Sequence, residues 1–355
     1  MSAVGRGLSR AATLLRTSVV YVLYYLGVLH IVQAVALRNK AVVLMYHRVL
    51  TPDDWAGSGS HPGIVVTDKT FDRHLRFLKR RFNVLSLSEF ADRLLRRLPF
   101  ENSSCLITFD DGWKDNLTNA LPLLRRHDLP AVIFLPVNFM GTRRQFWREA
   151  LTNLLVAAAP RVATSADQRS LFADILTPVD LADVLELRVG PDLRQRVIDR
   201  IAASPLARDD AERLVERLSQ SLGLRVADLV TPDRFLDWTD LAELSQYGVA
   251  FGGHGAEHVR LTDVSREVAR EEIERSRVVL SGVLGRAIQS FSYPNGAVNE
   301  AVTDDVRAAG YQLAFTTEPG LVDHRDDPLG VRRINLHEGA SSTIPLLMGR
   351  MLGLL

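Results

Sequence analysis

The stretch Cys105-Leu-Ile-Thr-Phe-Asp110-Asp111-Gly112-Trp113 is an apolar run that ends in two adjacent carboxylates and a glycine. A short apolar run bounded by turn residues predicts a buried strand of a parallel sheet. Neighbouring residues on a regular strand point to opposite faces, so two aspartates at a strand end can be given different tasks. In α/β folds, ligands and catalytic groups gather at the carboxyl ends of the strands. Taken alone, Asp-Asp-Gly also fits an ordinary strand-ending turn.

A second cluster, Phe251-Gly-Gly-His254-Gly-Ala-Glu257-His258, closes another apolar run that starts at Gly248. Two histidines separated by three residues can place both imidazoles on one side of a tight loop or a first helical turn. Such a pair on its own is more often structural than a metal site. One aspartate and two histidines together form the ligand set of a catalytic divalent metal with a position open for water. The two clusters therefore predict a metal site.

Strands and helices alternate through most of the chain. The run 41–49 contains His47 at a strand end, where a structural and a catalytic role are both open. Leucines at helical spacing follow the first two strands and predict helices, which indicates a parallel α/β sheet or barrel of about seven βα-like units. The later strands are expected at residues 131–135, 248–251, 289–294, 312–316 and 331–336.

The segment 143–235 interrupts this alternation, because it is rich in Leu, Ala, Arg and Asp and predicts several helices. We interpret it as an insertion, which either shapes a substrate cleft or is a spacer. The expected organisation is then an N-terminal hydrophobic helix, a barrel, the helical insertion and a C-terminal amphipathic helix. Their boundaries are 1–40, 41–142 with 236–340, 143–235, and 341–355.

The apolar stretch Val19–Leu37 is just long enough to cross a bilayer as a helix. His30 and Gln33 oppose deep insertion, whereas its tyrosines suit a membrane interface. No small-residue cleavage site follows, which argues against a removable signal peptide. A buried amphipathic helix is the alternative. We expect association with the cytoplasmic (inner) membrane, and the nearly balanced basic flanks leave its side undetermined.

The composition excludes some partners. The 355 residues include 43 basic and 42 acidic side chains, a net charge of +1, which gives no electrostatic reason to expect nucleic acid. The single cysteine, Cys105, excludes an intrachain disulfide.

Three motifs occur in order at strand ends: Thr108-Phe-Asp-Asp-Gly112, His254-x-x-x-His258 and Phe291-Ser-Tyr-Pro-Asn-Gly296. With these motifs the chain resembles the polysaccharide deacetylases, also called carbohydrate esterase family 4 or NodB-homology proteins. The resemblance covers about residues 41–142 and 236–336. The opening Met45-Tyr-His-Arg-Val49 resembles the subgroup whose motif order is circularly permuted.

The resemblance implies a deformed (β/α)7-type barrel and a divalent metal, most often zinc and sometimes cobalt or nickel. It implies that Asp111, His254 and His258 hold the metal and that Asp110 is the general base. Such a metal lowers the pKa of water and polarises the acetyl carbonyl.

Two further roles follow from the same resemblance. The permuted subgroup takes its catalytic acid from the first strand, which here is His47, and this acid would protonate the leaving amine. The turn of the third motif supplies a backbone N–H to the oxyanion, here that of Asn295. His337, in a late Leu-His-Glu string, resembles another family motif and competes with His47, which we favour as the acid.

Two positions depart from the family pattern. Gly255 stands where the residue after the first histidine is usually Ser or Thr, so a hydroxyl that would order the loop is missing. Ser292 replaces the arginine that usually orients the base. Arg332 or Arg333, at the end of the last strand, is our candidate to replace that arginine.

The sequence thus predicts a metal-dependent N-deacetylase. Its substrate would be an N-acetylated glycan or glycolipid, namely an amino sugar of a surface or exported polysaccharide or its lipid-linked precursor. One alternative is an inactive carbohydrate-binding protein on the same fold. Another is a deacylase of O-acetyl esters or small molecules, which would prefer esters to amides.

Overall fold

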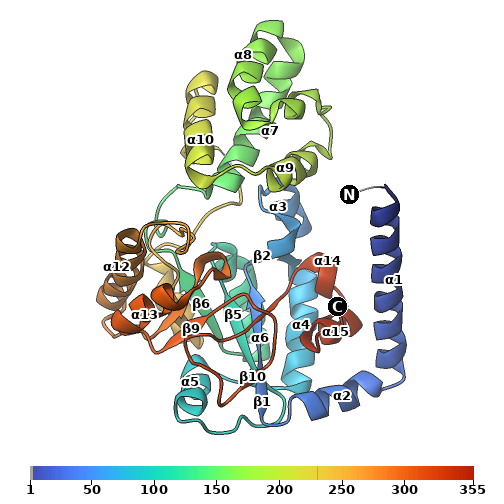
Figure 1. Cartoon of the computed structure of the whole chain (residues 1–355), viewed down its shortest axis with the longest axis vertical. Coiled ribbons are helices and arrows are strands. Elements are labelled where there is room, and N and C mark those ends of the chain that lie inside the picture. Colours follow the sequence, from blue (N-terminus) through green and yellow to red (C-terminus); the bar gives the residue numbers. More distant parts are fainter. Residues whose placement is uncertain (1–2, 230) are drawn as a thin grey trace. The chain divides into compact units, whose positions relative to one another are not determined.

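The predicted apolar runs form the parallel strands of one curled sheet (Figure 1). The structure is a computed structural model that describes residues 3–229 and 231–355. Six strands pair in parallel in the order β1, β5, β6, β7, β8, β9. Their bounds are Lys40–Tyr46, Ser104–Phe109, Ala131–Leu135, Val249–Gly253, Ser290–Ser292 and Leu313–Phe315.

Shorter strands extend this sheet. β4 (Asn83–Val84) pairs with β5, and β10 (Val322–Asp323) runs antiparallel to β1. β11 (Ile334–Asn335) is parallel to β1, and Val331, just before it, bridges Phe315 of β9. The segment 331–335 therefore connects the two ends of the curled sheet. The predicted α/β class with a deformed barrel is confirmed.

Alternation along the strands separates two cores. Val42, Leu44 and Tyr46 of β1 belong to the larger, outer cluster, whereas Ala41 and Val43 belong to a smaller, inner cluster. The strands β5 and β6 divide in the same way. Strands buried on both faces are expected to be continuously apolar, as these are.

Most of the helices around the sheet lie against its outer face (Figure 1), where their apolar residues join the larger cluster, whereas Phe90 and Leu94 of α5 join the inner cluster. α12 begins at Ser265, whose side chain accepts the Val268 N–H, and buries Ile273 and Leu280. α5 starts with a capping box between Ser86 and Glu89. The helices around the sheet are α4 (Asp68–Arg81), α5 (Leu87–Leu95), α6 (Leu121–His127), α11 (Asp240–Gln246), α12 (Arg266–Leu284), α13 (Glu300–Ala308), α14 (Glu338–Ser341) and α15 (Ile344–Met351).

The N-terminal apolar stretch differs from expectation, because it forms two helices instead of one. α1 (Ala3–Tyr25) and α2 (Val28–Ala36) meet at Gly27, whose φ of 77° is readily adopted only by glycine. No single described helix is long and apolar enough to cross a membrane. Leu14–Tyr25 and Val28–Ala36 reach that length only as a pair bent by 91°. Val20 and Leu29 pack against Met348 of α15.

The chain divides into two compact units. The first unit holds the nine-stranded sheet and consists of the chain up to Val49, Gly63–Gly141 and Leu236–Leu355. The second unit consists of Leu50–Pro62 and Thr142–Phe235. The segment Leu50–Pro62, which we assigned to the barrel, therefore belongs with the helices. The helices of the second unit are α3 (Pro52–Gly57), α7 (Trp147–Thr164), α8 (Ala166–Leu176), α9 (Leu193–Ala203) and α10 (Arg208–Leu222). The four helices α7 to α10 share their own apolar cluster.

Candidate metal centre

Asp111, His254 and His258 meet at the carboxyl ends of β5 and β7. Their ligand atoms all lie within 4.8 Å of one another. Asp111 Oδ1 is 3.4 Å from His254 Nε2 and 3.3 Å from His258 Nε2. The aspartate and the first histidine are buried, and the His258 side chain keeps 17% of its surface exposed. The structure thus brings together the three residues that the sequence analysis selected.

The donor set fits a divalent cation. His254 Nδ1 lies 2.7 Å from the Ser292 carbonyl oxygen. A carbonyl can only accept, so Nδ1 carries a proton, and in the neutral ring Nε2 then presents its lone pair. Ligand atoms about 2.0–2.1 Å from a tetrahedral zinc ion are about 3.3 Å apart, which is close to the distances of Asp111 Oδ1 from the two histidine nitrogens. One cation satisfies the Asp111 oxygen and both nitrogens at once, whereas one proton serves a single contact.

The backbone at this centre is unusual. Asp111 has a φ of 77° and His258 a φ of 55°, both in the left-handed region that non-glycine residues rarely occupy. At Asp111 this conformation breaks the strand alternation and turns the carboxylate away from its regular position. Gly112 also has a positive φ, and a Cβ there would lie 2.7 Å from Leu135 Cδ2. Strained conformations of this kind concentrate at functional sites.

Asp110 keeps the regular strand alternation and shares the inner face with Thr108. Arg333 binds it with two parallel hydrogen bonds of 2.7 Å, one from each terminal nitrogen. Ser292 accepts from Arg333 at 2.8 Å and donates to Asp110 at 3.3 Å. Burial raises the pKa of Asp110, but the charges of Arg333 and His254 outweigh burial and lower that pKa overall. Asp110 is therefore held ionised.

Arg333, and not Arg332, occupies the position of the expected arginine. Consecutive residues on an extended segment face opposite sides, and Ile334 and Leu336 belong to the outer core. Arg333 therefore faces inward and is fully buried, whereas Arg332 pairs with Asp326 and is 41% exposed. Ser292 is small, and the Arg333 guanidinium lies beside it and donates to its hydroxyl.

Glu272 of α12 orders the loop that carries both histidines. Its carboxylate accepts the N–H groups of Ala256 and Glu257 at distances from 2.9 to 3.1 Å. Gly255 has a φ of 74°, and a Cβ there would come within 2.9 Å of Glu272 Oε2. The missing hydroxyl at position 255 is thus replaced by a carboxylate, and glycine is the residue that fits. Sequence reasoning missed Glu272, whose only signal is an acidic residue near the apolar stripe of a helix.

His47 follows β1 by one residue, on the inner side by alternation. Burial lowers the pKa of His47, and this effect outweighs the charges of Asp111 and Asp110, which raise that pKa. The buried Nδ1 has no hydrogen-bond partner within the described residues. His337 ends the neighbouring segment, since Leu336 N–H donates to the Met45 carbonyl of β1 at 2.9 Å. Both candidate acids thus lie at the ends of adjacent extended segments. The choice of His47 stays a prediction.

The third motif forms a tight turn after β8. Asn295 lies at its tip with an exposed side chain and a φ of 56°. Gly296 N–H closes the turn by donating to the Tyr293 carbonyl at 2.8 Å. A backbone donor at position 295 therefore depends on the turn and not on the asparagine side chain. Its role toward an oxyanion stays a prediction.

Comparisons with known proteins show which family and fold the chain resembles. A family model described as polysaccharide deacetylase matches residues 98–155 and 213–314. The chain is 19% identical over 305 residues to YxkH of Bacillus subtilis (strain 168), whose name gives polysaccharide deacetylase as an unproven activity. That match covers 86% of this chain and 74% of the relative.

A poly-beta-1,6-N-acetyl-D-glucosamine N-deacetylase of Staphylococcus epidermidis is 32% identical over 113 residues, which is 30% of this chain and 39% of the relative. Among solved structures, Streptococcus pyogenes deacetylase PplD in complex with acetate is 18% identical, with a TM-score of 0.56. The match covers 88% of this chain and 98% of that one. IcaB from Ammonifex degensii, at 17% identity, gives a TM-score of 0.55 over 88% and 97% of the two chains. These structures share the fold.

Proposed function

Since the chain belongs to the polysaccharide deacetylase family, we propose that it is a metal-dependent hydrolase that removes N-acetyl groups from an amino sugar. The observation that carries the proposal is the cluster of Asp111, His254 and His258 beside a second carboxylate, Asp110, that is held ionised. The substrate class is a surface or exported polysaccharide or its lipid-linked precursor. The named activity of the Staphylococcus epidermidis relative supports an N-acetylated glucosamine polymer.

Each residue of the site has its own proposed role in amide hydrolysis. Asp111, His254 and His258 would hold a divalent metal, which we assign as zinc, and when bound this ion would supply Lewis-acid polarisation of the acetyl group and a water of lowered pKa. Asp110, oriented by Arg333, accepts the proton of the attacking water. His47 donates a proton to the leaving amine, which is a poor leaving group unless it is protonated. The Asn295 N–H donates to the oxyanion of the tetrahedral intermediate.

The activity test uses N-acetylglucosamine oligomers and the purified full chain with added zinc or cobalt. We expect release of acetate and of free amines in equal amounts. Replacing His47 by alanine removes the proposed acid, so turnover should fall by about 10²–10⁴-fold. His337→Ala is the matched variant. A collapse of turnover in His337→Ala alone would assign the acid to His337 instead.

An inactive binding protein is the weaker reading, because both departures from the family pattern have structural replacements. Arg333 binds Asp110 in place of the missing arginine, and Glu272 orders the loop around Gly255. Metal retention without acetate release from any acetylated glycan would support the binding protein. Faster release from O-acetyl esters than from matched N-acetyl amides would instead support an esterase.

We further propose that α1 and α2 lie on the cytoplasmic (inner) membrane, on a side that stays undetermined. Leu15, Val19, Val22 and Leu26 form an exposed apolar stripe at helical spacing. On α2, Ile31, Val32 and Val35 are also exposed. The opposite side packs on α15, so the described arrangement suits a helix pair lying in the interface more than one crossing the bilayer.

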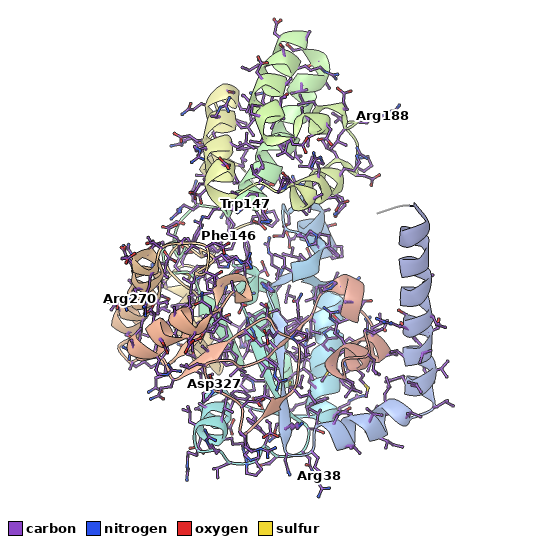
Figure 2. The ribbon with its side chains drawn as sticks, viewed as in Figure 1. Arg38, Phe146, Trp147, Arg188, Arg270 and Asp327 are labelled. Atoms are coloured by element: carbon purple, nitrogen blue, oxygen red, sulfur yellow. The ribbon has the colours of Figure 1, made fainter. Side chains whose placement is uncertain are left out.

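Basic residues flank the apolar stretch Val19–Leu37 in the sequence. Arg6, Arg10 and Arg16 precede it in the sequence, and Arg38 and Lys40 follow it. Arg38, labelled in Figure 2, is exposed just after α2. Cationic flanks around an apolar face favour anionic lipid, and each basic residue near the surface contributes about 1 kcal/mol. A membrane-bound enzyme would meet a lipid-linked or nascent glycan directly.

Flotation with vesicles that contain anionic phosphatidylglycerol tests this placement. The double change Val19→Glu with Val22→Glu should lower the vesicle-bound fraction several-fold. The matched control, Val278→Glu with Val283→Glu, places the same change on exposed valines of α12, which are 70% and 49% exposed. Equal binding by the two variants would contradict the proposal.

A further inference from the structure

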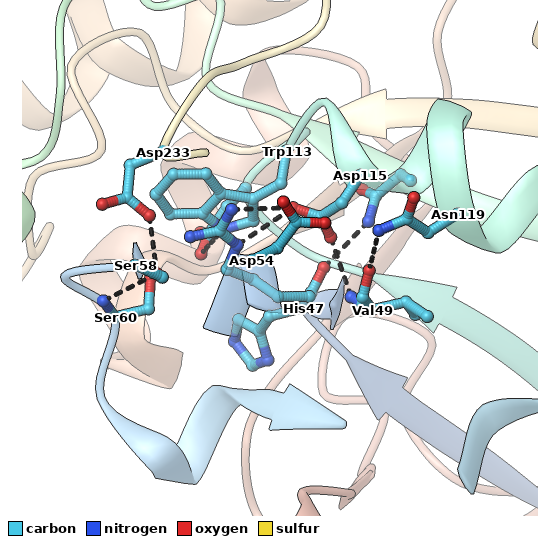
Figure 3. Close-up of polar contacts among 12 residues, drawn as sticks. His47, Val49, Asp54, Ser58, Ser60, Trp113, Asp115, Asn119 and Asp233 are labelled. Atoms are coloured by element: carbon cyan, nitrogen blue, oxygen red, sulfur yellow. Dashed lines mark hydrogen bonds and ion pairs between the residues drawn. The ribbon is translucent and has the colours of Figure 1, made fainter. Parts of the chain in front are cut away.

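A buried row of side chains connects the end of β1 to the ligand Asp111. Arg48 follows His47, is fully buried, and binds Asp115 Oδ2 through Nε at 3.0 Å and a terminal nitrogen at 2.9 Å. An arginine buried this completely needs a paired charge, and Asp115 provides it. Figure 3 shows Trp113 and Asp115 beside the strand end that carries His47.

Trp113 continues this row. Its ring lies under the Arg48 guanidinium, with the central carbon 4.2 Å from the ring centroid. This is a cation–π distance, and burial of both groups strengthens the attraction. The Trp113 indole N–H donates to Asp111 Oδ2 at 3.0 Å. Trp113 is therefore held on one side by Arg48 and holds a carboxylate on the other.

Because of this hydrogen bond, the two carboxylate oxygens of Asp111 have different partners. Oδ2 is engaged by the indole, whereas Oδ1 faces the Nε2 atoms of His254 and His258. The carboxylate is thus presented to a cation through one oxygen. Since the Asp111 backbone is in the left-handed region, the side-chain direction depends on such outside support.

Loop 113–119, which contains Trp113 and Asp115, also fixes the backbone around Arg48. Asn116 Nδ2 donates to the His47 carbonyl at 2.9 Å. Val49 N–H donates to Asp115 Oδ1 at 2.8 Å, and Asn119 Nδ2 donates to the Val49 carbonyl at 2.8 Å (Figure 3). The residues Asn116–Ala120 form a π-helical turn, a conformation that is frequent at functional sites.

We infer that Trp113 is a positioning residue that fixes Asp111 for metal binding, and that Arg48 and Asp115 hold Trp113 in place. Loop 113–119 then keeps the metal ligand and the His47 backbone in one rigid frame. Partners of this kind commonly change metal affinity about 10–100-fold when they are removed. The inference rests on the proposed function, since it concerns the same metal centre.

Zinc affinity of the full chain, measured by competition with a chromogenic chelator, tests this inference. Trp113→Phe keeps a ring under Arg48 but removes the N–H, and the dissociation constant for zinc should rise about 10–100-fold. The visible absorption of the cobalt-loaded variant should also change, because Asp111 can rotate. Trp238→Phe, a change of the same kind in the outer core, should leave the affinity unchanged.

The outcomes are distinguishable. An unchanged zinc affinity in folded Trp113→Phe overturns the inference while the proposed function stands. Absence of zinc binding in the wild type instead refutes the proposed function itself. Thermal unfolding of the metal-free variant shows whether it folds. If Trp113→Phe does not fold, Arg48→Lys replaces it, because this change keeps the charge and removes the flat guanidinium. We expect Arg48→Lys to bind zinc more weakly, and an unchanged zinc affinity would overturn the inference.

Discussion

His254 and His74 are both buried, and each engages a backbone carbonyl through one ring nitrogen, yet their second nitrogens differ. His74 Nε2 donates to the Ser341 carbonyl at 2.6 Å, and its Nδ1 is 3.1 Å from the Tyr46 hydroxyl. His254 Nδ1 donates to the Ser292 carbonyl, and its Nε2 faces Asp111 Oδ1. His74 therefore has a neutral partner on each ring nitrogen, whereas His254, as a neutral ring, presents a lone pair to another acceptor.

Buried aspartates show the same difference. In the second unit, Asp233 accepts from the Ser58 hydroxyl at 2.6 Å and the Gly59 N–H at 2.7 Å (Figure 3). Thr231 and Asn153 add donors at 2.9 and 3.0 Å. Among the described residues, Asp111 Oδ2 accepts only from the Trp113 indole N–H described above. Burial of an ionisable side chain thus does not identify a functional site, whereas converging acceptors do.

The largest expected effect is that of Asp111→Asn. An amide at this position still fills the space but binds a divalent metal poorly. Loss of a Lewis acid worth several kcal/mol should lower kcat/KM by at least about 10³-fold. The measurement is acetate release from N-acetylglucosamine oligomers. A loss of similar size in Asp233→Asn at a temperature where that variant is folded would remove the distinction between the two aspartates.

Arg333→Met should have the next largest effect. It leaves Asp110 buried without its guanidinium, so the base is neither oriented nor held ionised. We expect kcat to fall by about 10²-fold, which is within the range of general-base contributions. Arg332→Met is the matched control, because Arg332 pairs with Asp326 at the surface. Equal losses in both variants would show that Arg333 has no special role.

Asp233→Asn should act on stability and not on the metal. Its amide would place N–H groups against several donors, at a cost of about 3 kcal/mol in the free energy of unfolding. Chemical denaturation followed by circular dichroism measures this cost. Asp174→Asn, an exposed change in α8, should stay within about 0.5 kcal/mol of the wild type. Weaker zinc binding by folded Asp233→Asn would contradict the comparison.

His74 gives the smallest effect, a pH dependence of stability. Burial lowers the pKa of His74 from 6.5 to about 4. The unfolded chain therefore binds a proton more readily, so the stability is complete above pH 6.5 and is lost as the pH falls toward 4. At pH 5 the loss is about 2 kcal/mol by linkage. His74→Gln should reduce the difference in stability between pH 7 and pH 5 by that amount, and an unchanged difference would refute the neutral buried state.

The sequence predicts the sheet and most of the candidate metal centre for a physical reason. Apolar runs that end in Asp, His and Gly mark strand ends locally, so β5, β6 and β7 fall where they were expected. The inward-facing arginine could only be narrowed to Arg332 or Arg333, because the register of a two-residue strand has no local signal.

What the sequence did not predict depends on distant contacts. The segment Leu50–Pro62 belongs to the second unit because Ser58 and Gly59 bind Asp233, which lies more than 170 positions away. The contacts of Trp113 with Arg48 and Asp111 likewise appear only when β1 lies beside β5. At Gly27, a single positive φ turned one expected helix into two.

The most direct test of the metal centre is the zinc content of the purified chain after reconstitution and dialysis, in the wild type and in His254→Gln. His254→Gln removes the imidazole lone pair while keeping a side chain that can still bond the Ser292 carbonyl. We predict about one zinc ion per wild-type chain and none in the variant. No zinc in the wild type, or equal zinc in both proteins, would contradict the assignment of Asp111, His254 and His258 as metal ligands.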